Sequence, residues 1–254
     1  LGTDPATDAE IYFEQDDAVF LNVSKTESGD YILIRAGDSE TSEVQFFAAD
    51  DGKAAKPNVI KPREKGVEYD VHHRGDQFFI HTNKDGATEF KVMAAPVDAY
   101  GEENWVDVIP ARDDTTVEGI MCFKDYMIRE ERSNATPCIV VSDYNGNEYK
   151  IDFPDPAYDI AARQGYEFDT DVLRIHYETM ANPGVVYDVD LKSGQKTIRR
   201  EKKLPNGHDP SEYVVERVDV KADDGAEIPV TILRHKSVKA DGKAPLFQYG
   251  YGSY

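Results

Sequence analysis

The chain has 254 residues, of which 40% are hydrophobic. This is enough apolar material for one large or two small domains and too much for a disordered protein. Its 49 acidic residues outnumber the 29 basic ones and give a formal net charge of −20. Such a surface repels phosphate backbones and anionic lipids, so we expect neither nucleic acid nor a membrane as a partner.

The two cysteines, Cys122 and Cys138, are too few for a disulfide framework and lack the spacing of a zinc site. They favour a reducing compartment, which makes a cytoplasmic location the expectation. No apolar run approaches the roughly 18 residues that a membrane-spanning helix needs. The chain begins without a methionine and stops directly after an apolar run, so we expect it to be a piece of a longer protein.

Four segments of the chain share one outline, in which a turn-forming polar stretch precedes an apolar run. They align on Ile34, Ile80, Ile128 and Ile175, at spacings of 46, 48 and 47 residues. A second apolar run begins ten residues after each of these positions, at Val44, Phe90, Cys138 and Val185. The stretches between the paired runs are rich in turn formers, so each pair of runs predicts a β-hairpin.

Partial alternation of apolar and polar residues predicts further strands at 19–24, 67–72 and 166–169. Short strands grouped every 47 residues or so are typical of the four-stranded blades of a β-propeller. We therefore predict an all-β fold with a partial β-propeller of about four blades. A β-sandwich with accidental spacing is the alternative, although sandwich strands seldom recur in groups of four.

The pattern changes near residue 205, where residues 204–210 are typical of a linker. Beyond it we predict a hairpin of strands 213–220 and 228–234, with Pro229 at an edge or an end, and then a buried strand at 244–249. A hairpin that leads into a buried strand with a glycine-rich end is a common opening of an α/β-hydrolase sheet. The predicted domains are therefore a partial propeller at 1–205 and the start of an α/β-hydrolase peptidase domain at 206–254.

The closing run, Tyr249-Gly250-Tyr251-Gly252-Ser253-Tyr254, resembles the start of the peptidase domain of the prolyl oligopeptidase family. Its Ser-Tyr ending is similar to the oligopeptidase B (protease II) branch. Weaker collinear likenesses to that branch's propeller lie upstream, at 62–64, 82–87, 131–134 and 186–190. The resemblance implies a propeller that caps an α/β-hydrolase domain with a Ser-Asp-His triad. It also implies short peptides as substrates, cleaved after Arg or Lys in this branch, and the acidic chain suits such basic peptides.

The resemblance assigns two site residues to this chain. Tyr251 matches the tyrosine whose phenol donates a hydrogen bond to the oxyanion, and Tyr254 lies where the family has an aromatic residue near the substrate pocket. The residues alone favour a role as packing aromatics at a strand end, and the resemblance reverses that preference. The chain contains no G-x-S-x-G motif, so we expect the triad outside it and this chain alone to be inactive.

None of the six histidines can be assigned as the triad base, and no metal site or cofactor is expected. His72 and His73 are neighbours that point to opposite faces of a strand, which disfavours joint metal binding.

Two other functions remain open on the sequence. A non-catalytic propeller could bind a protein partner on its face, and the residues that follow Tyr254 would distinguish it from a peptidase. A sugar-acting propeller enzyme would need paired carboxylates, but the acidic pairs 50–51, 113–114 and 223–224 all lie in turn-like stretches.

Overall fold

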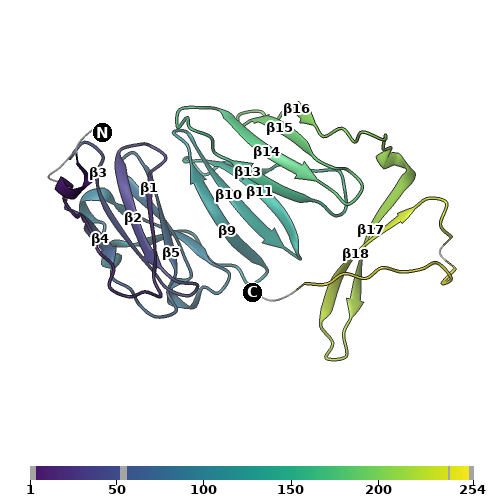
Figure 1. The fold of residues 1–254 in the computed structure, drawn as a ribbon, viewed down its shortest axis with the longest axis horizontal. Coiled ribbons are helices and arrows are strands. Elements are labelled where there is room, and N and C mark those ends of the chain that lie inside the picture. The colour runs from purple at the N-terminus through teal and green to yellow at the C-terminus, as the bar shows by residue number, and fades with distance from the viewer. Residues whose placement is uncertain (1–3, 52–55, 240, 252–254) are drawn as a thin grey trace.

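Four antiparallel sheets of four strands each follow one another along the part of the chain that the structure describes (Figure 1). This computed structural model describes residues 4–51, 56–239 and 241–251. In each sheet the strands are hydrogen-bonded in chain order, so every sheet is a simple meander. We call the sheets blades 1 to 4.

Each blade is built from four strands that are consecutive in the chain. Blade 1 contains β1 (Phe20–Lys25), β2 (Tyr31–Gly37), β3 (Ser42–Ala48) and β4 (Asn58–Lys61). Blade 2 contains β5 (Tyr69–Arg74), β6 (Gln77–Thr82), β7 (Lys91–Pro96) and β8 (Val106–Ile109). Blade 3 contains β9 (Thr115–Cys122), β10 (Tyr126–Ser133), β11 (Thr136–Asp143) and β12 (Glu148–Lys150). Blade 4 contains β13 (Asp159–Arg163), β14 (Val172–Glu178), β15 (Val185–Asp190) and β16 (Lys196–Glu201).

The helical structure in the described residues consists of single 3-10 turns. These are η1 (Pro5–Thr7), η3 (Lys84–Gly86), η4 (Val97–Ala99), η5 (Glu102–Asn104) and η6 (Pro210–Glu212). No helix among them is long and apolar enough to cross a membrane.

The sequence repeat corresponds to the blades. The four aligned isoleucines all lie in the second strand of a blade, in β2, β6, β10 and β14. Three of the four downstream runs begin inside a third strand, and the fourth begins at Phe90, one residue before β7. The prediction of four four-stranded blades is thus confirmed. The sandwich alternative is wrong, because the sheets stack in series and not as one pair.

Apolar cores fill the spaces between successive blades. Alternating residues of β6 show how this works, since Phe78 and Ile80 pack into the core shared with blade 1, whereas Phe79 packs into the core shared with blade 3. A third core between blades 3 and 4 includes Ile128 and Ile175, both fully buried. Because a strand's side chains alternate between faces, a blade buried on both sides needs apolar residues on both.

One predicted strand is wrong. Residues 166–169 form part of an irregular connection, with Tyr166 fully exposed, and the first strand of blade 4 is β13 instead. Gly165 adopts a left-handed φ of 76° just after β13, which ends the extended backbone there. The alternation of residue types in this stretch therefore does not correspond to a paired strand.

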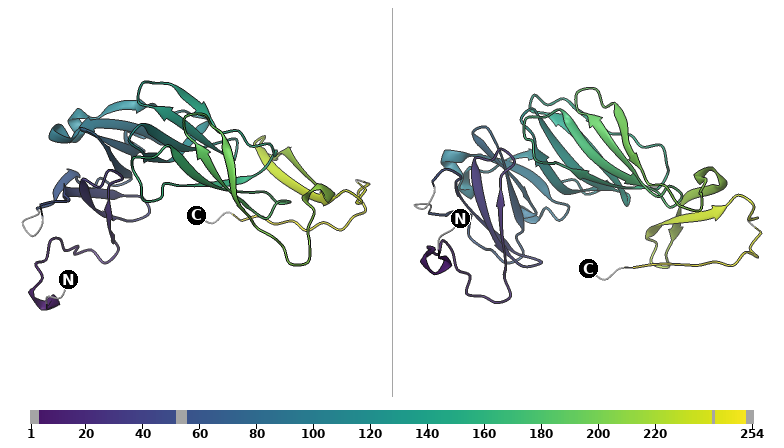
Figure 2. Two further views of the ribbon diagram at one scale, coloured as in Figure 1. Left: turned by 90° about the horizontal axis from the view of Figure 1, so that it is seen from above. Right: turned by 45° about the horizontal axis from the view of Figure 1, so that its top comes forward.

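The hairpin beyond the linker is confirmed. Strands β17 (Tyr213–Lys221) and β18 (Glu227–His235) pair with each other, with Pro229 opposite Asp219, and form a two-stranded sheet of their own after blade 4 (Figure 2). A two-stranded ribbon has only edges, which explains why proline is tolerated inside β18.

The buried strand predicted at 244–249 is wrong for this chain. The segment forms no strand, and Leu246, Phe247 and Tyr249 are 84%, 88% and 79% exposed. An apolar strand needs a neighbour for its backbone groups and a layer over its side chains. Among the described residues, no strand pairs with this segment.

Candidate functional site

The segment after β18 carries the tyrosine singled out by the sequence. Tyr251 lies at the end of the described chain, in irregular backbone, with 68% of its surface exposed. Tyr254, the predicted substrate contact, lies outside the described residues. The role of Tyr251 as an oxyanion donor stays a prediction, as does that of Tyr254.

A polar recess of about 430 Å³ opens where blades 1 and 2 meet. Its walls come from β1, β2 and β5, with a contribution from Gln164 after β13. Asn22 and Ser24 line it from β1, and Asp70 and His72 from β5. The first strands of blades 1 and 2 therefore present hydrogen-bonding groups to this recess, beside the apolar side chains Leu33, Val44 and Val71.

A second recess of about 310 Å³ lies between blades 2 and 3 and shares Arg35, Asp70 and His72 with the first. Glu68 and Glu118 add two carboxylates to its wall. Arg35 Nε lies 3.0 Å from Asp70 Oδ1, and both side chains are more than 40% exposed, so solvent screens this pair. The two recesses form one polar strip that runs across the first strands of three blades.

The most buried charged pair of this strip joins three blades. Glu27, in the turn between β1 and β2, forms a short hydrogen bond to His72 Nδ1, and the side chains are only 10% and 19% exposed. The Glu27 carboxylate also accepts from the backbone N–H of His73 at 3.4 Å and of Cys122 at 3.5 Å. One side chain of blade 1 thus contacts blades 2 and 3.

Proximity shifts both pKa values of this pair. Burial alone would lower the pKa of His72, but the adjacent Glu27 carboxylate outweighs burial and raises it. Burial alone would raise the pKa of Glu27, but the charge and hydrogen bond of His72 outweigh it and lower the pKa. Each partner therefore favours the charged form of the other.

We expect the free energy of unfolding of Glu27→Gln to fall less steeply than that of the wild type as the pH rises above neutral. Because folding raises the pKa of His72, its contribution is full below about pH 6.5 and is lost as the pH rises through the raised value. The variant should be about 1–2 kcal/mol less stable at pH 6, and the difference should narrow toward pH 9. Urea unfolding of both proteins across this pH range measures the difference in their free energies of unfolding. Asp30→Asn, at a 64% exposed carboxylate nearby, is the control, and a pH-independent loss in Glu27→Gln would contradict the expectation.

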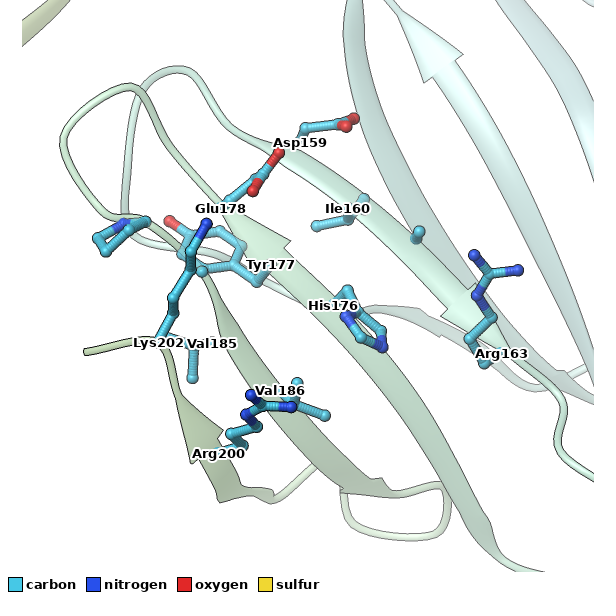
Figure 3. Close-up of a pocket in the computed structure, with 13 residues that line it drawn as sticks. Asp159, Ile160, Arg163, His176, Tyr177, Glu178, Val185, Val186, Arg200 and Lys202 are labelled. Atoms are coloured by element: carbon cyan, nitrogen blue, oxygen red, sulfur yellow. The ribbon is translucent and has the colours of Figure 1, made fainter. Parts of the chain in front are cut away.

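Blade 4 has a third recess of about 430 Å³ on the face that points away from blade 3 (Figure 3). His176 lies in the middle of this recess, with Arg163 and Arg200 on either side of it. Asp159 and Glu178 lie near its upper edge in the view, so the recess contains charges of both signs. Alternation in β14 produces this face, since Leu173 and Ile175 turn into the core while Arg174 and His176 turn outward.

The adjacent histidines of β5 make different contacts. His72 contacts Glu27, whereas His73 packs against Tyr31 and Phe78, so the two neighbours do lie on opposite faces of β5. Across residues 4–51, 56–239 and 241–251, no three His, Cys, Asp or Glu side chains are grouped to hold a metal ion. The importance of Glu27 was missed from the sequence, because the turn 26–30 carries no motif and its partners are 45 or more residues away.

Comparison with known proteins gives one consistent result. The family model of the prolyl oligopeptidase N-terminal β-propeller domain matches residues 1–202. Over its whole length the chain is 37% identical to dipeptidyl aminopeptidase BI of Pseudoxanthomonas mexicana and 28% identical to protease 2 of Moraxella lacunata. It spans 35% and 36% of those two proteins, so it matches about a third of their length.

Solved structures give the same fold. Oligopeptidase B from Leishmania major superimposes with a TM-score of 0.87 at 23% identity, over 95% of this chain and 35% of that one. With the matched family model covering most of its residues, this chain belongs to the prolyl oligopeptidase family, and its blades are part of the N-terminal β-propeller of that family.

Proposed function

We propose that the chain is part of a serine oligopeptidase that hydrolyses short peptides after Arg or Lys. In this proposal residues 1–205 form part of the propeller and residues 206–254 begin the α/β-hydrolase peptidase domain. The rest of that domain supplies the Ser-Asp-His triad. The observation that carries the proposal is the likeness to protease 2 of Moraxella lacunata, which extends over 100% of this chain, from the blades into the Tyr-Gly-Tyr-Gly segment.

The blades would act as a filter in front of the catalytic centre. The polar strip on their first strands offers hydrogen bonds to an extended peptide, and each of its recesses, about 430 and 310 Å³, has room for a few side chains. Excluding folded proteins protects them from cleavage and keeps bulk water from the reacting groups.

A preference for basic peptides would follow from the charge of the chain. A net charge of −20 attracts cationic substrates and raises their local concentration, and this effect weakens as salt is added. The same charge and the two free cysteines, Cys122 and Cys138, are compatible with a cytoplasmic location.

The test is a substrate panel assayed with the full-length protein. Arginyl, lysyl and prolyl amides with identical flanking residues are compared, and arginyl peptides of increasing length are then cleaved. We expect kcat/KM for the basic amides to exceed that for the prolyl amide about 100-fold, with cleavage ceasing for folded proteins. A prolyl preference would contradict the branch, release of N-terminal dipeptides would indicate a dipeptidyl peptidase, and no hydrolysis at all would favour a non-catalytic binding module.

A further inference from the structure

The recess between blades 2 and 3 contains one carboxylate without a counter-charge. Its other charged or titratable side chains that face the strip are all paired, as Arg35–Asp70, His72–Glu27 and Glu118–Arg132. Glu68, which precedes β5, lies in no ion pair within the described chain, and its carboxylate accepts one long hydrogen bond, from Asn83 Nδ2 at 3.4 Å. The wall of the recess therefore keeps one uncompensated negative charge.

The surroundings of Glu68 disfavour its charged form. Burial raises the pKa of the Glu68 carboxyl most, and the charge of Arg35 opposes this without reversing it. The carboxylates of Asp70, Asp38 and Glu40 raise the pKa further. A cation bound beside Glu68 would replace the solvation that burial removes and would offset the surrounding negative charge.

A buried histidine offers an unused acceptor to the same recess. His81 lines the recess and is only 7% exposed. Its Nε2 lies 2.7 Å from the carbonyl oxygen of Val117, and because a carbonyl only accepts, Nε2 carries the proton and donates. Burial lowers the pKa of His81, which favours the neutral ring. No described residue donates to Nδ1, so this nitrogen is left to accept from an N–H group of a ligand.

An aromatic ring stands beside this acceptor. Phe90 lines the recess, and its ring stacks on that of His81 with the centroids 4.8 Å apart. Aromatic rings attract ammonium and guanidinium groups, which a carboxylate and a free acceptor also bind. Within the described ranges no three His, Cys, Asp or Glu side chains are grouped for a metal ion, so a larger, organic cation is the better match.

We propose that Glu68, His81 and Phe90 form a subsite for a second cationic group of the peptide, other than the Arg or Lys at the cleaved bond. The group is a guanidinium or an ammonium, carried by a further basic side chain or by the N-terminus of the peptide. This subsite rests on the proposed function, since the recess belongs to the polar strip along which an extended substrate would lie.

The test uses the full-length protein and acetylated peptides with one arginine before the cleaved bond. At one other position, moved stepwise along the peptide, each carries arginine or citrulline, which has nearly the same shape without the charge. We expect one position at which arginine lowers KM about tenfold relative to citrulline. Glu68→Gln, which can keep the hydrogen bond from Asn83, should reduce this ratio to less than about twofold, and Phe90→Leu should reduce it about threefold.

Glu40→Gln is the matched control, because it removes the same charge from an exposed carboxylate that influences Glu68 but does not line the recess. It should retain the tenfold ratio. A second set of peptides, with citrulline at the second position and a free N-terminus, identifies the source of the cation. A lower KM for these than for their acetylated forms would assign the subsite to the N-terminal ammonium.

Equal KM values for arginine and citrulline at every position, with no gain from a free N-terminus, would overturn the subsite in the wild type alone, whether or not the variants fold. A tenfold ratio that persists in Glu68→Gln would contradict it too. Equal losses in Glu40→Gln and Glu68→Gln would replace it with long-range attraction by the net charge.

Equilibrium binding separates the subsite from the proposed function. The same peptides are used with the bond after the constant arginine N-methylated, which prevents cleavage, and their Kd values are measured by titration. A charge preference in Kd that depends on Glu68, in a protein that cleaves none of the parent peptides, would refute the proposed function and keep the subsite. Cleavage after arginine without any such preference would keep the function and refute the subsite.

Discussion

Replacing Tyr251 with phenylalanine in the full-length protein is expected to lower kcat about 100- to 1000-fold with little change in KM. Attack on a peptide carbonyl places negative charge on its oxygen, and a donor already aimed at that oxygen contributes about 3–4 kcal/mol to lowering the barrier. Phenylalanine retains the ring and its packing, so only the donated hydrogen bond is lost. Steady-state kinetics on an arginyl amide measures the effect.

The matched control for this prediction is Tyr249→Phe, in the same segment and at similar exposure, 79% against 68%. If the effect belongs to a single donor, Tyr249→Phe should retain kcat within a few-fold. Equal losses in both variants would indicate that the tyrosines support the segment's structure, and wild-type activity in Tyr251→Phe would remove its assigned role.

The blades could be predicted because their sequence pattern is local. A strand, its hairpin loop and the next strand lie within about twenty residues, and turn formers bracket each apolar run. Ile34 and Ile80 could therefore be matched as equivalent positions from the residue pattern alone, and both lie in second strands. The first strand of each blade was harder to predict, because its exposed face carries both apolar and polar residues. In β1, for example, every residue is exposed.

The chemistry between blades could not be predicted in this way. Glu27 and His72 are 45 residues apart, and Arg217 reaches a carbonyl 83 residues away. Such pairs depend on how neighbouring sheets are stacked and rotated, which no local pattern encodes. Residues 244–249 show the opposite error, since their apolar composition is typical of a buried strand, although burial also requires a neighbouring layer.

Removal of one buried carboxylate in blade 3 is expected to destabilise the propeller strongly. Glu131, 1% exposed, accepts hydrogen bonds from Arg112 Nη2 at 2.5 Å and Arg129 Nε at 2.9 Å. Burial alone would raise the pKa of Glu131, but hydrogen bonds and charges from the two arginines outweigh burial and lower it. Glu131→Gln preserves the shape of the side chain and leaves the nearly buried Arg129 with Glu148, a 55% exposed carboxylate 2.9 Å from its Nη2, as its remaining counter-charge. We expect this to cost about 3 kcal/mol.

Glu118→Gln is the control for this prediction, because Glu118 on β9 pairs with Arg132 on β10 in the same blade but at an exposed site, with side chains 36% and 40% exposed. The Glu118→Gln substitution should lower the free energy of unfolding by less than about 1 kcal/mol.

The pH dependence of stability separates the two variants further. Since folding lowers the pKa of Glu131, its contribution is present above about pH 4.3 and is lost as the pH falls through the lowered value. Wild type and Glu118→Gln should therefore lose stability in acid more steeply than Glu131→Gln, and equal urea midpoints for the two variants at pH 7 would show that the buried pair contributes no more than the exposed one.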